Sequence, residues 1–169
     1  MSGALIVTAD PGAADLAPLE ALRRLHFPPG RNQLPAHLTL FHALPPSLES
    51  EVTEALRQEA RGKAPRARLR PPYSLGGGVA FRILSTELDD LRARLAERFH
   101  GALSAQDAAG FRAHVTIQNK VAPKIARALL DELTRGFREQ PFRIAALSLH
   151  RYLGGPWQPL GRYPFRGLP

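Results

Sequence analysis

The chain has 169 residues, of which 44% are hydrophobic and 22% are charged. This length fits one globular domain that can bury a core unaided. The absence of cysteine excludes disulfides, thiolate nucleophiles and cysteine-based zinc sites. No apolar run approaches the roughly 20 residues of a membrane-spanning helix, and the first residues lack the basic segment of a signal peptide. We therefore expect a cytoplasmic protein with no membrane partner.

The net charge of +8 favours a polyanionic partner such as nucleic acid. Most of the excess lies after residue 77, where 14 basic residues face 8 acidic ones, against 9 and 7 before it. However, 20 of the 23 basic residues are arginine, and alanine and proline are also abundant. Codon bias in a GC-rich genome is therefore an open alternative explanation for the charge.

The first half of the chain alternates strand-like and helix-like segments. Short apolar runs rich in β-branched residues predict strands, and leucines at helical spacing predict helices. Asp10 and Pro11 are expected to begin the first helix, and Ser47 is expected to cap the second. The predicted elements are a strand at 3–8, a helix ending near 26, a loop at 27–35, a strand at 37–43, a helix at 47–63 and a strand at 67–70.

The same order begins again after Gly76, Gly77 and Gly78. We interpret these glycines as a flexible hinge between lobes, because they precede a strand and lack the Lys-Ser/Thr of a phosphate loop. Thr86 is expected to cap the third helix and Pro123 to open the fourth. The predicted elements are a strand at 78–85, a helix from 86, a loop at 104–110, a strand at 112–119, a helix from 123, and strands at 142–153 and about 160–165.

This repetition predicts the fold class. The equivalent strands of the two stretches lie about 77 residues apart, which is too long for a solenoid repeat and indicates a duplicated lobe. We predict an α+β fold with two pseudo-symmetric halves, forming a single two-lobed domain over 1–169 with lobes at about 1–75 and 78–165. The alternative is that two such stretches follow one another by chance.

One four-residue pattern occurs at equivalent places in both halves. HLTL at residues 37–40 and HVTI at residues 114–117 each read His, apolar, Thr, apolar. Because side chains alternate along a strand, each His and Thr should share one face while the apolar residues point into the core. The chain has only six threonines and six histidines, so two chance occurrences are improbable.

The paired motifs favour acid–base chemistry on a phosphate. With an ordinary pKa near ~6.5, one imidazole can accept a proton while another donates one, and hydroxyl groups can bond phosphoryl oxygens. Zinc is an alternative, but such a site usually needs a third ligand, and no His-Glu-x-x-His motif occurs. The candidate catalytic residues of a site without metal are His37, Thr39, His114 and Thr116.

The two segments resemble the His-x-Thr-x motifs of the two-histidine phosphoesterases, which include the bacterial RNA 2′,3′-cyclic phosphodiesterases, often named 2′-5′ RNA ligases. The resemblance covers nearly the whole chain. It implies two lobes whose antiparallel sheets line a central cleft, with helices outside and one motif from each lobe. It also implies cofactor-free hydrolysis of 2′,3′-cyclic phosphates on RNA ends or nucleotides, or reversibly the formation of 2′-5′ linkages. By resemblance His114 is the base, His37 is the acid, and both threonines hold phosphate oxygens.

Strand alternation adds four candidate substrate-binding residues. Phe41 should share the face of His37, where it either stacks on a base or packs at the rim. Arg112, Gln118 and Lys120 should share the face of His114, where the cations either attract the phosphate or are solvated strand ends. The parity of His42 is opposite, which predicts a structural or exposed residue.

Two further functional hypotheses remain open at this stage. The chain could keep the same fold as an RNA- or nucleotide-binding protein without turnover, or it could have no functional cleft, with the two motifs far apart. Tyr152 and Trp157 could line a nucleoside pocket, although packing within a hairpin explains them equally. We expect a monomer.

Overall fold

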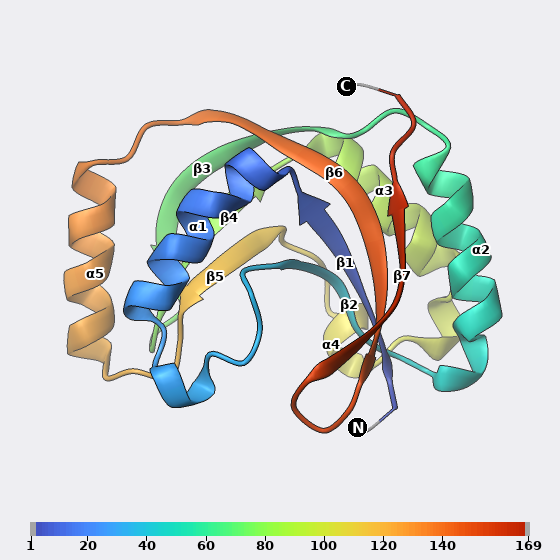
Figure 1. Ribbon diagram of the computed structural model, residues 1–169, viewed down its shortest axis with the longest axis horizontal. Helices are drawn as coiled ribbons and strands as arrows, with labels where there is room; N and C mark the ends of the chain where they lie inside the picture. Colours follow the sequence, from blue (N-terminus) through green and yellow to red (C-terminus); the bar gives the residue numbers. More distant parts are fainter. Residues whose placement is uncertain (1–2, 168–169) are drawn as a thin grey trace.

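The computed structural model describes residues 3–167, so residues 1–2 and 168–169 of the predicted domain lie outside the described residues. Within this range the chain forms seven strands and five α-helices, which confirms the α+β class (Figure 1). All paired strands are antiparallel. They form one sheet in the order β2-β1-β6-β3-β4-β5, with β7 paired to β6.

The elements have the following bounds. The strands are β1 (Leu5–Pro11), β2 (Leu38–Leu44), β3 (Arg66–Ser74), β4 (Val79–Leu84), β5 (His114–Gln118), β6 (Gln140–Tyr152) and β7 (Trp157–Pro164). The helices are α1 (Ala13–His26), α2 (Glu49–Ala60), α3 (Thr86–Arg98), α4 (Ala105–Ala108) and α5 (Pro123–Arg135). Short 3₁₀ helices occupy Pro29–Arg31, Pro46–Leu48 and His100–Ala102.

The long strand β6 joins two groups of strands. Its first residues pair with β3, while the rest pairs with β1 and β7. We call β1, β2, β7 and the later part of β6 the first lobe, and β3, β4, β5 and the start of β6 the second lobe. Each lobe therefore combines strands from both sequence halves. The edge strands β2 and β5 contact each other in the middle of the molecule (Figure 1).

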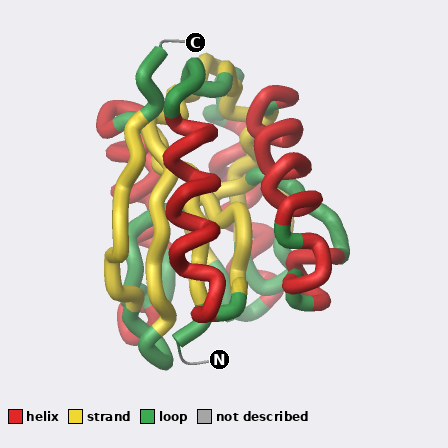
Figure 2. The backbone as a smooth tube through the Cα atoms, turned by 90° about the vertical axis from the view of Figure 1, so that its right-hand side faces the viewer, coloured by secondary structure: helices red, strands yellow, loops and turns green. Residues whose placement is uncertain are grey.

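The helices flank the strands, as Figure 2 shows. Helix α1 packs on β5, α5 packs on β3 and β4, and α2 packs on β6 and β7. The four apolar motif residues are each at most 1% exposed and belong to the core, as alternation predicted: Leu38, Leu40, Val115 and Ile117. Within residues 3–167, no helix is both long and apolar enough to cross a bilayer.

Three predicted helix starts are wrong by one or more residues. Asp10 and Pro11 complete β1, because the carboxylate of Asp10 accepts a hydrogen bond from the Thr8 hydroxyl at 3.0 Å instead of capping α1. Residue 47 lies in the 3₁₀ helix that precedes α2. Ser85, not Thr86, caps α3, since its Oγ accepts the Leu88 N–H at 3.0 Å.

Two segments predicted as irregular are regular. Strand β3 continues through Pro71 and Pro72 to Ser74, and its pairing with β4 is interrupted between Leu69 and Pro72. Such an irregularity lets a strand hold prolines that cannot donate to the ladder. The predicted loop at 104–110 contains the short helix α4.

The glycines predicted to form a hinge between lobes form the tight turn between β3 and β4 instead. The Leu75 N–H donates to the Gly78 carbonyl at 2.8 Å, and Gly76 has a φ of +84°. A Cβ atom on Gly78 would lie 2.0 Å from the Gln118 carbonyl oxygen, so this turn presses directly on the end of β5. Only glycine allows that approach.

We expect Gly78→Ala to lower the free energy of unfolding by at least about 2 kcal/mol, because the new methyl group must displace the backbone of β5. Gly101→Ala is the matched control, since its Cβ would meet nothing within 4 Å. Urea unfolding of both variants tests this expectation. Equal stability of the two variants would show that β5 yields freely at this contact.

Candidate active site

The structure brings one candidate catalytic residue of each motif, Thr39 and His114, to one cavity, whereas His37 and Thr116 are not among the residues that line it. His37 directly precedes β2, and His114 is the first residue of β5. Thr39 and His114 line the same cavity of about 200 Å³ between these edge strands. Each is partly buried. The alternative in which the motifs lie far apart is therefore wrong.

Both imidazoles are oriented by the same local hydrogen bond. His37 Nδ1 lies 2.8 Å from the Pro35 carbonyl oxygen, and His114 Nδ1 lies 2.7 Å from that of Arg112. A carbonyl oxygen only accepts hydrogen bonds, so Nδ1 carries the proton in both rings. In each ring Nε2 is left to accept or donate a proton.

A β-bulge occurs at the same point of both motifs. The residues paired with successive positions of β1 step from Thr39 to Phe41, and those paired with β4 step from Thr116 to Gln118. The extra residue is the fourth residue of each motif. A bulge breaks the alternation of side chains. The residues directly after it therefore lie on the opposite face from the one that alternation predicts.

Phe41 and Gln118 are consequently buried, with 0% and 3% of their surface exposed. The Phe41 ring lies under the Arg92 guanidinium, whose carbon is 4.2 Å from the ring centroid. A ring with no exposed surface cannot stack on a base, so Phe41 packs in the core. Gln118 likewise does not share the exposed face of His114 as predicted, because its side chain is enclosed and its Oε1 has no hydrogen-bond partner among residues 3–167.

The bulge on β2 has the opposite effect on His42. Its side chain is 42% exposed and lines the same cavity as Thr39 and His114. The sequence predicted that His42 is structural or exposed; the residue is exposed, but it does not face away from the site. No feature of the sequence marks the bulge, so strand parity could not identify this residue.

The two predicted cations differ in position. Arg112 is exposed and lines the cavity, and its guanidinium carbon lies 5.6 Å from the centroid of the Tyr73 ring. Lys120 lies beyond β5 with a φ of +61° and is not among the residues that line this cavity. Arg112 therefore accompanies the motif residues, whereas Lys120 does not.

The comparisons with known proteins agree with this geometry. The family model of the 2′-5′ RNA ligase superfamily matches residues 10–156. The chain belongs to this superfamily.

Several solved structures have the same fold as this chain. TT0787 of Thermus thermophilus is 20% identical, with a TM-score of 0.63 over 97% of this chain and 98% of that one. E. coli LigT complexed with NADP+ is 17% identical, with a TM-score of 0.60 over 98% and 99% of the chains. A structure described as a phosphoesterase is 16% identical, with a TM-score of 0.63 over 98% and 99%. No curated protein sequence matches this chain significantly.

Each of the two motif histidines, His37 and His114, has an aromatic neighbour. The rings of His37 and Trp157 have centroids 4.8 Å apart at 60°, and those of His114 and Tyr73 are 6.4 Å apart at 77°. Trp157 also contacts His150, with centroids 5.2 Å apart. Sequence reasoning named Trp157 as a possible pocket residue but missed Tyr73 and His150, because neither belongs to a motif.

Arg82 is a further cation that the sequence did not single out. It lies directly opposite His114 in the pairing of β4 with β5. Directly opposed residues of antiparallel strands share a face, so Arg82 and His114 share one. Its strand neighbours Phe81 and Ile83 are core residues, which leaves Arg82 on the face of the motif.

The surroundings of His37 favour its neutral form. Burial lowers its pKa from 6.5 to about 4, the Pro35 carbonyl opposes this shift, and the charges of Arg23, His150 and His114 lower the pKa further. His37 is therefore unprotonated at neutral pH. Burial also lowers the pKa of His150, against the opposing charge of Asp10.

Arg23 connects helix α1 to both motifs. It is 4% exposed, and its Nη1 donates to the Thr116 carbonyl at 2.8 Å. Its Nε donates to the Leu34 carbonyl at 3.1 Å and to Asn32 Oδ1 at 3.0 Å, in the segment that leads to His37. One guanidinium thus ties the second motif to the segment that precedes the first.

Arg92 of α3 has the corresponding role at β2. It is 6% exposed, and its Nε donates to the Leu40 carbonyl at 3.1 Å. Its Nη2 donates to the Asp107 carbonyl at 2.7 Å. Arg92 therefore fixes the bulge of the first motif to the segment around α4.

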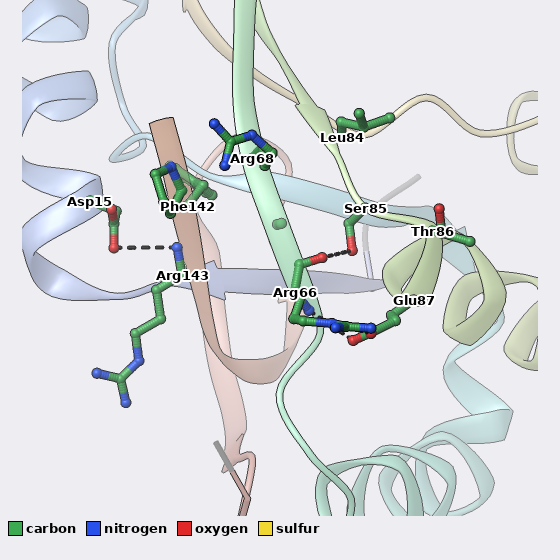
Figure 3. Close-up of a pocket in the computed structure, with 11 residues that line it drawn as sticks. Asp15, Arg66, Arg68, Leu84, Ser85, Thr86, Glu87, Phe142 and Arg143 are labelled. Atoms are coloured by element: carbon green, nitrogen blue, oxygen red, sulfur yellow. Dashed lines mark hydrogen bonds and ion pairs between the residues drawn. The ribbon is translucent and has the colours of Figure 1, made fainter. Parts of the chain in front are cut away.

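Another cavity, of about 680 Å³, lies elsewhere, and Figure 3 shows its lining between β3, β6 and the start of α3. No motif residue lines it. Its Arg66 side chain pairs with Glu87 at 2.7 Å, so part of its positive charge is neutralised. Among residues 3–167, no three His, Asp or Glu side chains are grouped as metal ligands.

We expect Arg23→Met to lower the free energy of unfolding by about 2–4 kcal/mol, because it leaves buried carbonyl groups without a charged donor. The exposed neighbour Arg24 provides the matched control, and Arg24→Met should change stability by no more than about 0.5 kcal/mol. Thermal and urea unfolding measure both changes. Equal loss in the two variants would mean that the buried hydrogen bonds of Arg23 do not hold the two segments together.

Proposed function

We infer that this protein is a phosphodiesterase that hydrolyses 2′,3′-cyclic phosphates at RNA ends or on nucleotides without a metal or cofactor. Membership of the 2′-5′ RNA ligase superfamily supports phosphoester chemistry. The observation that carries the proposal is that the carbonyls of Pro35 and Arg112 orient the two imidazoles alike, at the starts of two strands whose Thr39 and His114 line one cavity.

In the proposed reaction, the cyclic phosphate lies between the two motifs. One imidazole Nε2 takes a proton from water as the water oxygen attacks phosphorus. The bond from phosphorus to one ribose oxygen breaks, and the other imidazole donates its proton to that oxygen. The hydroxyls of Thr39 and Thr116 donate hydrogen bonds to the non-bridging phosphate oxygens, and the Arg112 guanidinium offsets the negative charge of those oxygens. The reverse sequence would form a 2′-5′ linkage, although dilute aqueous conditions favour hydrolysis.

We assign the base to His37 and the acid to His114. The resemblance to the family implied the opposite assignment, but a pKa lowered to about 4 leaves His37 neutral at pH 7. A neutral ring with Nδ1 protonated has its lone pair on Nε2, which is the state a general base requires. An acid with so low a pKa would be almost wholly unprotonated before the reaction began.

A nucleotide- or RNA-binding protein without turnover is the second candidate. E. coli LigT, which has a similar fold, has been solved in complexes with NADP+, ATP and 3′-AMP. These ligands support a nucleotide as the class of molecule bound here, and either candidate function would use it. The cytoplasmic location and the monomeric state stay predictions from the sequence.

We expect His37→Ala and His114→Ala each to reduce hydrolysis of nucleoside 2′,3′-cyclic phosphates by about 10²–10⁴-fold, the usual contribution of one acid–base group. The exposed His100 supplies the control variant His100→Ala, which should keep full activity. Assays in EDTA follow the opened nucleotide by chromatography. Full activity in both motif variants would refute the mechanism, and an inert wild type that still binds nucleotides would favour the second candidate.

The pH profile tests the assignment of roles. We expect kcat/KM to fall as pH decreases through about 4, because His37 becomes protonated there, rather than near the ordinary ~6.5. Circular dichroism at each pH verifies that the fold persists. An acidic limb at or above pH ~6.5 would exclude His37 as the base.

A further inference from the structure

The cavity that contains Thr39 and His114 continues beyond the motifs to a second pair of side chains. His42 Nδ1 lies 3.0 Å from Asp107 Oδ1, and both residues line the cavity. Gln106 and Tyr73 line it as well. The reaction proposed above uses none of these four residues.

The buried carboxylate of Asp107 is hydrogen-bonded to the backbone of β2. Its side chain is 1% exposed, and its carboxylate accepts the backbone N–H groups of His42 and Ala43 at 2.9–3.0 Å. Burial alone would raise the pKa of Asp107, but the hydrogen bonds from His42 and Ala43 outweigh it and lower that pKa. The carboxylate is therefore an anion whose oxygens face protein donors.

This carboxylate determines how His42 can act. A carboxylate only accepts hydrogen bonds, so Nδ1 of His42 must donate to Asp107. Nε2 is then the nitrogen free to meet a ligand, and the 42% exposed ring lines the cavity. To donate through Nε2 to a phosphate oxygen as well, the ring must carry a proton on both nitrogens.

The other polar groups of this cavity also suit an anion. Arg112 and Tyr73 supply donors, and Asp107 is the only acidic residue in the lining. Arg92 also lines the cavity, and its guanidinium donates to the carbonyls of Leu40 and Asp107. Arg112 and the Tyr73 hydroxyl therefore offer the kind of donors that a phosphate group accepts.

We propose that His42, held by Asp107, binds a second phosphate group of the substrate beside the phosphate that reacts. This inference rests on the proposed function and narrows the substrate class. The preferred substrate is a 2′,3′-cyclic phosphate whose nucleoside also carries a 5′-phosphate, as the terminal residue of an RNA chain does. His42 is a binding residue in this scheme, and Asp107 is its positioning residue.

The variant His42→Asn separates this role from a purely structural one. Asparagine places its amide nitrogen near the position of Nδ1 and can still donate to Asp107, but it has no atom in place of Nε2. The substrates are uridine 2′,3′-cyclic phosphate with and without a 5′-phosphate. The control variant His26→Asn removes a histidine from the end of α1, outside the cavity.

We expect wild type to favour the 5′-phosphorylated substrate by about tenfold in kcat/KM through a lower KM, the effect of one charge-assisted hydrogen bond. His42→Asn should lose this preference, because it loses more kcat/KM on the 5′-phosphorylated substrate than on the other, and His26→Asn should keep it. A wild type without preference, or equal losses on both substrates in His42→Asn, would overturn the proposal.

Calorimetric binding distinguishes failure of the subsite from failure of the proposed function. Uridine 3′,5′-bisphosphate should bind wild type about tenfold more tightly than uridine 3′-phosphate, and His42→Asn should bind the two alike. If wild type hydrolyses neither substrate but shows this difference, the proposed reaction fails and the subsite stands. If the two ligands bind wild type equally, the subsite fails whether or not hydrolysis occurs. Equal melting temperatures of wild type and His42→Asn verify that the variant folds.

Discussion

Two buried guanidinium groups, Arg23 and Arg92, hold together the strands that carry the motifs. An edge strand presents carbonyl groups that no neighbouring strand satisfies, and here both edge strands, β2 and β5, meet inside the molecule. Arg23 of α1 bonds the Thr116 carbonyl, and Arg92 of α3 bonds the Leu40 carbonyl. Each helix thus supports the motif of the opposite sequence half. The bonds that satisfy these edges also fix the relative position of the two histidines.

The sequence could predict which motif residues belong to the core because the motifs follow strand alternation, and Thr39 and His114 line one cavity. Alternation fails immediately after the motifs, since a bulge adds one residue to each strand. Phe41 and Gln118 were therefore assigned to the wrong face, and His42 was assigned away from the site. Bulges depend on pairing partners far along the chain, which local pattern cannot reveal. The predicted start of the first helix is wrong for a related reason. Asp10 and Pro11 are typical of a helix start, but the Asp10 carboxylate accepts a hydrogen bond from the Ser148 hydroxyl, which keeps Asp10 in the sheet.

The two histidines make the same hydrogen bond, from Nδ1 to the backbone carbonyl two residues earlier. Their neighbours, however, give the two rings different electrostatic surroundings. His37 is packed against Trp157 and lies near the charge of Arg23, so burial and that charge both lower its pKa. His114 lies beside Tyr73 and is paired across the sheet with Arg82. Two identical side chains can thus take opposite roles in proton transfer, because burial sets one of them in the neutral state.

The overall basic charge says less about the site than the position of a few groups does. On the outer surface Arg66 pairs with Glu87. Exposed pairs of this kind are screened and contribute little, which fits arginine supplied by genome composition. In the motif cavity the only acidic residue in the lining is Asp107, and its oxygens are occupied by backbone N–H groups and by His42. These donors compensate the one negative charge of the lining, which leaves Arg112 as its exposed cation, and composition alone could not reveal this arrangement.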